Sequence, residues 1–345
     1  MNIPTISLAQ FAGFLKKYLK SGDKLRPVAG WGPVGVGKSS VIRQVTEELE
    51  IGFIDVRASQ LEPVDVRGIP TIEDGLTKFA LPDWLPNVER DGEFGVLGLD
   101  EFHSAMGSVQ TAFYSLKQER VLGDYTLPDG WTIVVFSNRP EDGASVHGRI
   151  DSAIANRYIT QFNLLPEINS FTDWAFANGV DPLVIGFLQF KEELLHQYPN
   201  GGIPKSDTVI ATPRSWASVG DILALDLDPV LEQAALEGAI GPAPAAEFVA
   251  FKRLFDLLPD WKDCFADPDN APIPADVSTQ YAIISQLSNK VGTLAGIAND
   301  QFEAGARYAS RISDELVQVF IRLVVTRDDT FKATTTYIDH SIANQ

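Results

Sequence analysis

Gly32-Pro-Val-Gly-Val-Gly37-Lys38-Ser39 decides the fold, because it matches the phosphate-binding P-loop pattern at every position. Its glycines let the main chain wrap closely enough to aim several N–H groups at a β-phosphate. Lys38 supplies a point charge for the β- and γ-phosphates, and the Ser39 hydroxyl can ligate Mg²⁺. We therefore expect a bound nucleotide, held by Gly32, Pro33, Val34, Gly35, Val36, Gly37, Lys38, Ser39 and Ser40.

The residues on either side of this loop have the order that a P-loop requires. Leu25–Ala29 is short and mostly apolar, as a buried strand would be. In Ser40–Leu49 the apolar residues recur at every fourth position, which predicts a helix. The amino end of that helix would add its dipole and its free N–H groups to the phosphate site.

Composition restricts the class of protein. The 345 residues carry a formal net charge of -18, which argues against a broad nucleic-acid-binding surface, and 45% of them are hydrophobic, which suits a globular fold. Cys264 is the single cysteine, so an intrachain disulfide and a cysteine-based zinc cluster are excluded. We expect it to be a core residue and the protein to be cytoplasmic. We expect no signal peptide and no bilayer span, because the first residues lack a basic start followed by an apolar run and no apolar stretch reaches about 20 residues.

Strands and helices alternate in the first half of the chain. Ser7–Leu19 predicts an amphipathic helix, with Ser7 as N-cap and Gln10 closing a capping box. Further strands are expected over Ile51–Val56, Val96–Leu99 and Thr132–Ser137, with a helix over Ser108–Gln118 and a hairpin over Arg120–Trp131. This pattern predicts an α/β fold, a parallel sheet flanked by helices that binds ligands at the carboxyl ends of its strands.

The pattern becomes helical after Pro166. Helices are expected over Phe171–Asn178, Pro182–Tyr198, Pro213–Leu225, Pro229–Glu237, Ala246–Leu257, Val277–Val291 and Ala306–Val325, with a connection over Pro259–Ala275. We therefore expect three domains: a nucleotide-binding domain over 1–165, an all-helical lid over 166–258 and a helical C-terminal extension over 259–345.

Polar residues follow two of the expected strands. Asp100 and Glu101 come directly after Val96–Leu99, where Asp100 would hold the metal and Glu101 would polarise water. Asn138 ends the next strand and can orient the attacking water without adding negative charge. Each residue also has a plain alternative, since an acidic pair can be a solvated strand end and Asn138 can simply begin a turn.

Together these motifs resemble the AAA+ ATPases, and within them the MoxR branch. The likeness covers about residues 4–225. It also rests on segments outside the P-loop and the two strand ends: Leu61–Pro70, Leu81–Pro86, the Arg120–Trp131 hairpin, Arg157 in Ala153–Tyr158, and Ala211–Trp216.

The resemblance implies an ATPase that uses ATP and Mg²⁺, with a role for each matching residue. Lys38 and Ser39 would make the Walker A contacts, Asp100 and Glu101 the Walker B pair, and Asn138 sensor 1. Arg157 would be the arginine finger that reaches the neighbouring subunit's nucleotide, although Arg149 precedes the same expected helix and stays a candidate. Arg214 would be the sensor-2 arginine of the lid.

The resemblance also implies a homo-oligomer, typically a hexameric ring, that remodels or chaperones a client protein. The first partner it suggests is a protein with a von Willebrand factor A domain. The segments Gly68–Pro86 and Arg120–Gly130 would project toward the ring face or pore. Their aromatic residues Phe79, Trp84 and Tyr125 would either contact the client or pack these segments onto the sheet.

Two other functions fit the same nucleotide site. One is a DNA-directed motor or loader of the phage type, against which the acidic charge counts. The other is a nucleotide-gated scaffold that binds ATP and assembles with little turnover, against which the complete Asp100–Glu101 pair counts.

Overall fold

A computed structural model describes residues 3–22, 24–139, 142, 158–198, 209–255, 258–292 and 298–342. The chain divides into two compact units, which are described separately. The first comprises Met1–Pro166 with Tyr198–Ser206, and the second comprises Glu167–Gln197 with Asp207–Gln345.

The first unit is built on a six-stranded sheet with the order β1-β10-β2-β9-β6-β3. Every neighbouring pair in this sheet is parallel. Its strands are β1 (Thr5–Ser7), β2 (Val28–Trp31), β3 (Gly52–Arg57), β6 (Phe94–Asp100), β9 (Gly130–Ser137) and β10 (Thr160–Leu165). A parallel sheet presents the carboxyl ends of all its strands at one edge. Because β2, β9 and β6 are consecutive in the sheet, the loops that follow them lie side by side at that edge.

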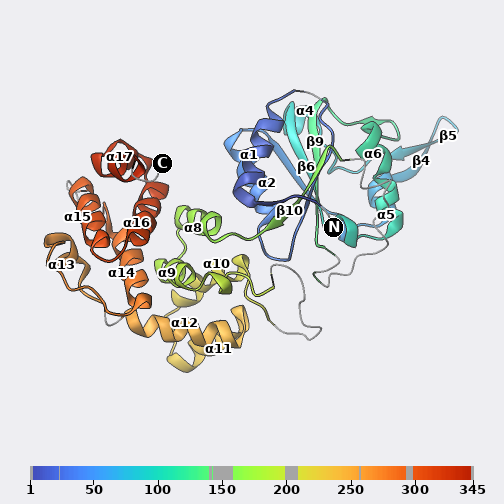
Figure 1. Ribbon diagram of the computed structural model, residues 1–345. Coiled ribbons are helices and arrows are strands. Elements are labelled where there is room, and N and C mark those ends of the chain that lie inside the picture. Colours follow the sequence, from blue (N-terminus) through green and yellow to red (C-terminus); the bar gives the residue numbers. More distant parts are fainter. Residues whose placement is uncertain are drawn as a thin grey trace. The chain divides into compact units, whose positions relative to one another are not determined.

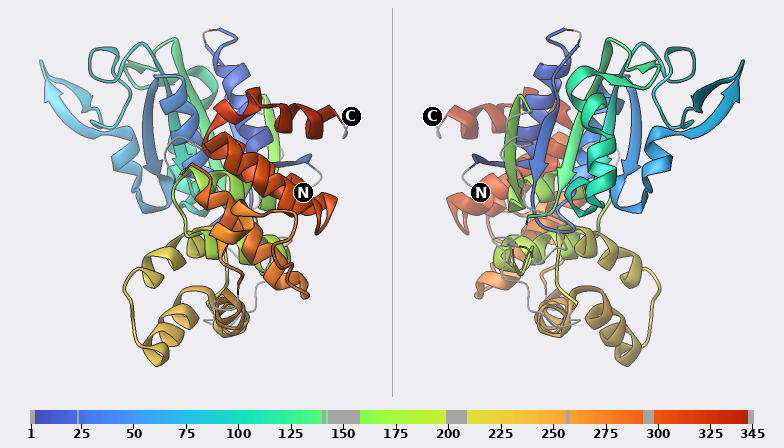
Figure 2. Two further views of the ribbon diagram at one scale, coloured as in Figure 1. Left: turned by 90° about the vertical axis from the view of Figure 1, so that its left-hand side faces the viewer. Right: turned by 90° about the vertical axis from the view of Figure 1, so that its right-hand side faces the viewer.

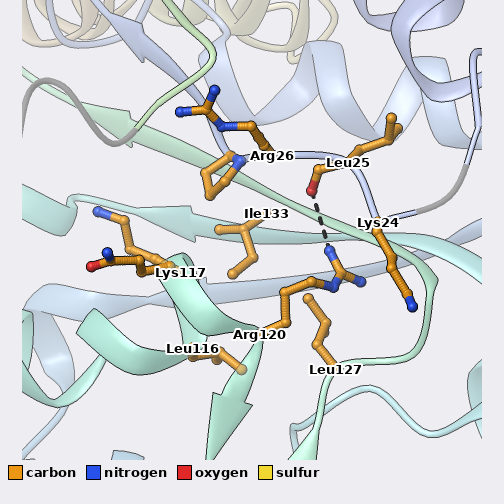
Figure 3. Close-up of a pocket in the computed structure, with 10 residues that line it drawn as sticks. Lys24, Leu25, Arg26, Leu116, Lys117, Arg120, Leu127 and Ile133 are labelled. Atoms are coloured by element: carbon orange, nitrogen blue, oxygen red, sulfur yellow. Dashed lines mark hydrogen bonds between the residues drawn. The ribbon is translucent and has the colours of Figure 1, made fainter.

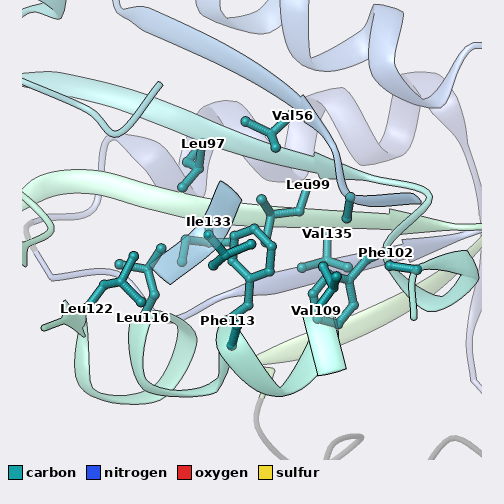
Figure 4. Packing of buried hydrophobic residues seen from close by; sticks show 14 of the residues in the cluster. Val56, Leu97, Leu99, Phe102, Val109, Phe113, Leu116, Leu122, Ile133 and Val135 are labelled. Carbon is teal, nitrogen blue, oxygen red and sulfur yellow. The ribbon is translucent and has the colours of Figure 1, made fainter. Parts of the chain in front are cut away.

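Both faces of the sheet are buried, which explains why its central strands are apolar at nearly every position. Along β9, Ile133 and Val135 belong to one core cluster, while Val134 and Phe136 belong to another. Figure 4 shows the first cluster, in which Phe113 and Leu116 lie against the strands.

Helices cover the two faces (Figure 1). α1 (Leu8–Leu19) and α2 (Lys38–Glu48) bury Phe11, Val41 and Val45 against one face. α5 (Gly107–Ala112) and α6 (Tyr114–Glu119) cover the other. The capping box expected at Ser7 and Gln10 is present. Shorter elements complete the unit: η1 (Ala58–Gln60), α3 (Pro63–Arg67), α4 (Val88–Asp91) and η2 (Phe102–Ser104).

Two antiparallel hairpins lie outside the main sheet. β7 (Val121–Leu122) pairs with β8 (Tyr125–Thr126) as expected. β4 (Ile69–Glu73) pairs with β5 (Leu76–Ala80) in a region for which no strand was predicted. The β4–β5 hairpin extends away from its unit (Figures 1 and 2) and leaves Phe79 49% exposed. Trp84 and Tyr125 instead pack against the core cluster that contains Phe113 and Leu116, which supports a packing role for these two aromatics.

The fold class predicted from the sequence is confirmed, with local differences. The expected helix over Ser108–Gln118 is two short helices that meet at Phe113. The two strands β1 and β10 were not anticipated, because β1 has only three residues and β10 mixes polar and apolar residues without a clear period.

The second unit contains no strand among its described residues. Its helices begin with α8 (Ile168–Ala177), α9 (Pro182–Phe190), η4 (Glu192–Leu194), α10 (Pro213–Leu223), α11 (Pro229–Ile240) and α12 (Pro242–Phe255). They continue with α13 (Trp261–Ala266), α14 (Val277–Lys290), α15 (Ala298–Ser310), α16 (Asp314–Arg327), η5 (Asp329–Ala333) and α17 (Thr335–Ile342). α14 packs against α9, α12 and α16.

Some expected helices of this unit are shorter or divided. The helix that begins at Pro182 ends at Phe190, and the one expected over Ala306–Val325 is split between α15 and α16, where Ser313 caps the second helix. The expected connection over Pro259–Ala275 contains α13, in which Cys264 is a fully buried core residue. None of the helices in the described part of the chain has the length and apolar character that a bilayer span requires.

Candidate functional site

The P-loop connects the end of β2 at Trp31 to the start of α2 at Lys38. Gly35 and Gly37 adopt φ values of 76° and 98°, in the left-handed region that favours glycine. Gly32 is needed for a different reason, since a Cβ there would stand 2.4 Å from the carbonyl oxygen of Leu164. The glycines are thus required by the path of the loop, which brings main-chain N–H groups to the amino end of α2.

Lys38 is the best anchored side chain of the site and is only 8% exposed. Its Nζ donates to the carbonyl oxygens of Gly32 at 2.9 Å and Pro33 at 2.8 Å. It also donates to Oδ1 of Asn138 at 2.8 Å. The structure therefore joins two predicted site residues that are separated by a hundred positions in the sequence.

Asn138 is held by the residue that follows it. Arg139 is 5% exposed and its Nε donates to Oδ2 of Asp142 at 2.8 Å. Nη1 of Arg139 donates to Oδ1 of Asn163 on β10 at 3.2 Å. A buried ion pair thus fixes the chain directly after Asn138, a contribution that sequence analysis missed because an arginine after a strand is usually exposed.

Asp100 is the last residue of β6 and Glu101 comes directly after it. β6 is the neighbour of β9 and the next strand but one from β2. Two strand spacings amount to about 10 Å, a distance that a triphosphate bound at the P-loop can bridge. Oδ1 of Asp100 accepts a hydrogen bond from the Glu101 N–H at 2.8 Å. Glu101 itself has φ 53°, an unusual conformation for a side chain other than glycine, of the kind that occurs at functional sites.

Ser59 is a contact that sequence analysis did not find. Its hydroxyl donates to Oε2 of Glu101 and so fixes the direction of that carboxylate. Ser59 follows β3, and β3 pairs with β6 up to Arg57 and Asp100. In a parallel sheet, residues that follow two adjacent strands lie close together. The position of Ser59 shortly after an expected strand was therefore the feature of the sequence that could have indicated this contact.

His103 is a second residue that the sequence analysis did not place near the site. It is 2% exposed, and its ring lies 4.3 Å from that of Trp31, which precedes the P-loop. Its Nδ1 is 2.7 Å from Oγ of Ser137, which precedes Asn138, and its main-chain N–H donates to the same oxygen at 3.1 Å. His103 thus contacts residues next to both the P-loop and Asn138, two positions after Glu101.

Burial lowers the pKa of His103 to about 3, and the charge of Lys117 acts in the same direction. The unfolded chain takes up a proton at this histidine near its ordinary pKa of 6.5, whereas the folded chain does not. The contribution of this histidine to the free energy of unfolding is therefore fully present above that pH and is lost as the pH falls toward 3.

Between about pH 7 and about pH 5 we expect wild type to lose about 2 kcal/mol more unfolding free energy than His103→Gln, measured by urea unfolding. Equal losses in the two proteins would show that His103 is protonated in the folded state.

The residues present fit a magnesium ion that is bound together with phosphates. Among the described residues no group of three or more His, Cys, Asp and Glu side chains could hold a metal alone. Mg²⁺ in nucleotide sites needs only one or two protein ligands beside phosphate oxygens and water. Ser39, in the first turn of α2, and Asp100 are the candidates.

The predicted arginines belong to other parts of the chain than the site described above. Arg157 and Arg149 both lie outside the described residues. Arg214 belongs to the second unit, where it is exposed in the first turn of α10. That turn is well fixed, since Thr212 and Ser215 form a capping box and Nε1 of the buried Trp216 donates to the Leu194 carbonyl at 2.8 Å.

Comparison with known proteins gives only distant likenesses. No family model matches the chain, and no curated protein matches it. NtrX from Brucella abortus in complex with ADP is a similar solved structure, with 15% identity, a TM-score of 0.41 and coverage of 98% of this chain and 67% of NtrX. RuvB from Thermotoga maritima, described as a Holliday junction branch migration motor, has 13% identity, a TM-score of 0.35 and coverage of 92% and 86%. These low values do not identify the family of this chain.

Proposed function

We propose that this protein is an AAA+ ATPase that binds ATP and Mg²⁺ at the P-loop. The observation that carries the proposal is the hydrogen bond between Lys38 and Asn138, with Asp100 and Glu101 on the next strand of the same sheet edge. A phosphate-binding loop, a neutral amide and a carboxylate pair in this order form the groups that phosphoryl transfer to water requires.

Each residue then has one task. Lys38 and the N–H groups of the loop bind the phosphates, while Ser39 and Asp100 hold the metal. The ion would supply charge for the leaving phosphate oxygens. Glu101, oriented by Ser59, accepts a proton from the attacking water, and Asn138 positions that water.

We propose further that hydrolysis needs two subunits. Arg157, or in its place Arg149, would reach the nucleotide of a neighbouring subunit, and Arg214 would sense it from the lid. A guanidinium group supplied by a neighbour stabilises the spreading charge of the γ-phosphate and is worth about 10³- to 10⁵-fold in related nucleotide hydrolases. Assembly would thereby control the reaction.

The finer parts of the proposal follow the resemblance to the MoxR branch. They are a hexameric ring in the cytoplasm and the remodelling of a client protein, with a von Willebrand factor A domain protein as the first candidate partner. We also propose that the helical unit comprises a lid over 166–258 and an extension over 259–345. Its buried apolar residues form two clusters, one mainly on α8 to α12 and the other on α13 to α16, although Ala282 of α14 and Leu323 of α16 belong to the first.

Mixing two inactive variants tests the shared site. Arg157→Ala should bind ATP without hydrolysing it, and Lys38→Ala should not bind ATP but should still offer its own arginine to a neighbour. In an equal mixture, about a quarter of the interfaces would combine an intact P-loop with an intact arginine, so we expect phosphate release to return to about that share of the wild-type rate. The assembly mass with ATP and Mg²⁺ checks that mixed rings form.

Arg149→Ala in the same mixture identifies the finger. If Arg149 is the finger, only that variant shows rescue and Arg157→Ala hydrolyses ATP alone. The absence of rescue for either arginine at every mixing ratio would contradict a site shared between subunits.

A further inference from the structure

The ends of three neighbouring strands are joined at Ser137, the last residue of β9. Its carbonyl oxygen accepts a hydrogen bond from the main-chain N–H of Gly32, the first residue of the P-loop, at 3.2 Å. Its hydroxyl oxygen accepts one from the main-chain N–H of His103, which follows Glu101 by two positions, at 3.1 Å. Asn138 comes directly after Ser137. The P-loop, the loop after β6 and the amide of the proposed site are therefore all attached to one residue that has no task of its own in the proposed reaction.

The hydrogen bonds around the Ser137 hydroxyl determine which nitrogen of the His103 ring carries the proton. The hydroxyl has a single proton and donates it to the carbonyl oxygen of Phe136 at 2.7 Å. Nδ1 of His103 lies 2.7 Å from the same hydroxyl oxygen, so Nδ1 has to be the donor in this contact. The hydroxyl oxygen then accepts two hydrogen bonds from His103, which uses both of its acceptor positions.

The surroundings of Nε2 agree with this assignment. Nε2 of His103 is buried, and it has no hydrogen-bond partner among the residues that the structure describes. With the proton on Nε2, two lone pairs would face each other between Nδ1 and the Ser137 hydroxyl, and a ring N–H would be buried without an acceptor. The neutral ring with its proton on Nδ1 avoids both costs.

The neighbours of the ring keep it neutral. His103 is 2% exposed, and its ring lies 4.3 Å from that of Trp31 and 5.2 Å from that of Phe102. Lys117 of α6, which is among the residues around the pocket in Figure 3, places its Nζ 4.2 Å from the centre of the Phe102 ring. Burial and this positive charge both lower the pKa of His103, so the ring does not become an imidazolium at neutral pH.

We propose that His103 is a positioning residue of the nucleotide site, which acts through Ser137 on Asn138 and on the P-loop. This inference rests on the function proposed above for that site. The bond from Nδ1 to the Ser137 hydroxyl ties the loop after β6 to the end of β9, and the contact with Trp31 ties the same loop to the end of β2. Asn138 is thereby held where it meets Lys38 before nucleotide binds, which is how supporting residues preorganise a site.

Loss of the ring should affect turnover more than binding. His103→Leu keeps an apolar side chain without the hydrogen bond, and we expect it to lower kcat for ATP hydrolysis at least about tenfold and to change the Kd for ATP less than about threefold. His103→Asn should keep kcat within about threefold of wild type, because an amide nitrogen can donate from the position of Nδ1. His196→Leu is the matched control, since His196 is a similarly buried histidine of the second unit, and its kcat should stay within about twofold of wild type.

Ser137→Ala removes the other partner of the hydrogen bond. If His103 acts through Ser137, the double variant of Ser137→Ala and His103→Leu should lose no more kcat than His103→Leu alone. Thermal unfolding of each variant shows which of them fold, and kcat is compared among those. Losses that multiply in the double variant would contradict an action through Ser137.

Nitrogen NMR of the full chain with isotope-labelled histidine tests the position of the proton in wild type, without any variant activity. At neutral pH, the histidine signal that is absent from His103→Asn should belong to a ring with a protonated Nδ1 and an unprotonated Nε2. A proton on Nε2 would overturn the proposal, and so would wild-type kcat in a folded His103→Leu protein. Absence of phosphate release from wild type would instead contradict the proposed function, and the NMR result would then decide the state of His103.

Discussion

Glu101→Gln is expected to lower kcat for ATP hydrolysis at least about a hundredfold and to leave the Kd for ATP nearly unchanged. Glutamine keeps the shape of the side chain and an oxygen that can accept the Ser59 hydrogen bond. It cannot take a proton from water. The loss therefore falls on the chemical step rather than on binding or assembly.

Phosphate release at saturating ATP, together with ATP titration by calorimetry, measures the two quantities. Glu89→Gln on α4 is the matched control, since it makes the same chemical change on an exposed helix of the same unit. Equal turnover in wild type and Glu101→Gln would contradict the assignment of the base. If wild type itself released almost no phosphate while ATP still drove its assembly, the nucleotide-gated scaffold would be the better description.

Lys38→Ala is expected to raise the Kd for ATP by at least about a hundredfold, which corresponds to about 2.7 kcal/mol. In the proposed site Lys38 would make charge-assisted contacts to the phosphates, and its removal would leave the phosphate charge without this partner. The same change removes the hydrogen bonds to Gly32, Pro33 and Asn138, so part of the loss reflects a less ordered loop.

Two measurements separate these contributions. Lys38→Arg keeps the charge but not the shape, and Lys20→Ala removes an exposed lysine beyond the end of α1 as a control. Thermal unfolding of each variant reports whether the unit stays folded. Unchanged ATP affinity in a folded Lys38→Ala protein would mean that the nucleotide binds elsewhere.

The sequence was most informative where several local signals agree. The P-loop, the strand before it and the helix after it are specified by glycine spacing, an apolar run and a four-residue period, and the structure has β2 and α2 at these places. Asp100 and Asn138 could be assigned to one edge of the sheet because each follows an apolar strand, and in parallel sheets such ends share an edge.

The rest depends on contacts between distant segments. Nothing near Ser59 in the sequence indicates that its hydroxyl meets Glu101, and the environment of His103 is set by Trp31 and Ser137 on other strands. The pairing of β1 with β10 joins residues about as far apart as the unit allows. Such contacts have no local period, so propensity and spacing do not reveal them.

The three protons of the Lys38 ammonium group already meet three oxygens of the protein. A phosphate that engages this group has to take the place of at least one of them. Gly32 and Pro33 offer main-chain oxygens that the loop cannot easily withdraw, whereas Asn138 can release its amide by a side-chain rotation. Nucleotide binding would then replace the hydrogen bond between Lys38 and Asn138 with one between Lys38 and a phosphate oxygen. The rotation of the Asn138 amide would be the first conformational change that ATP causes.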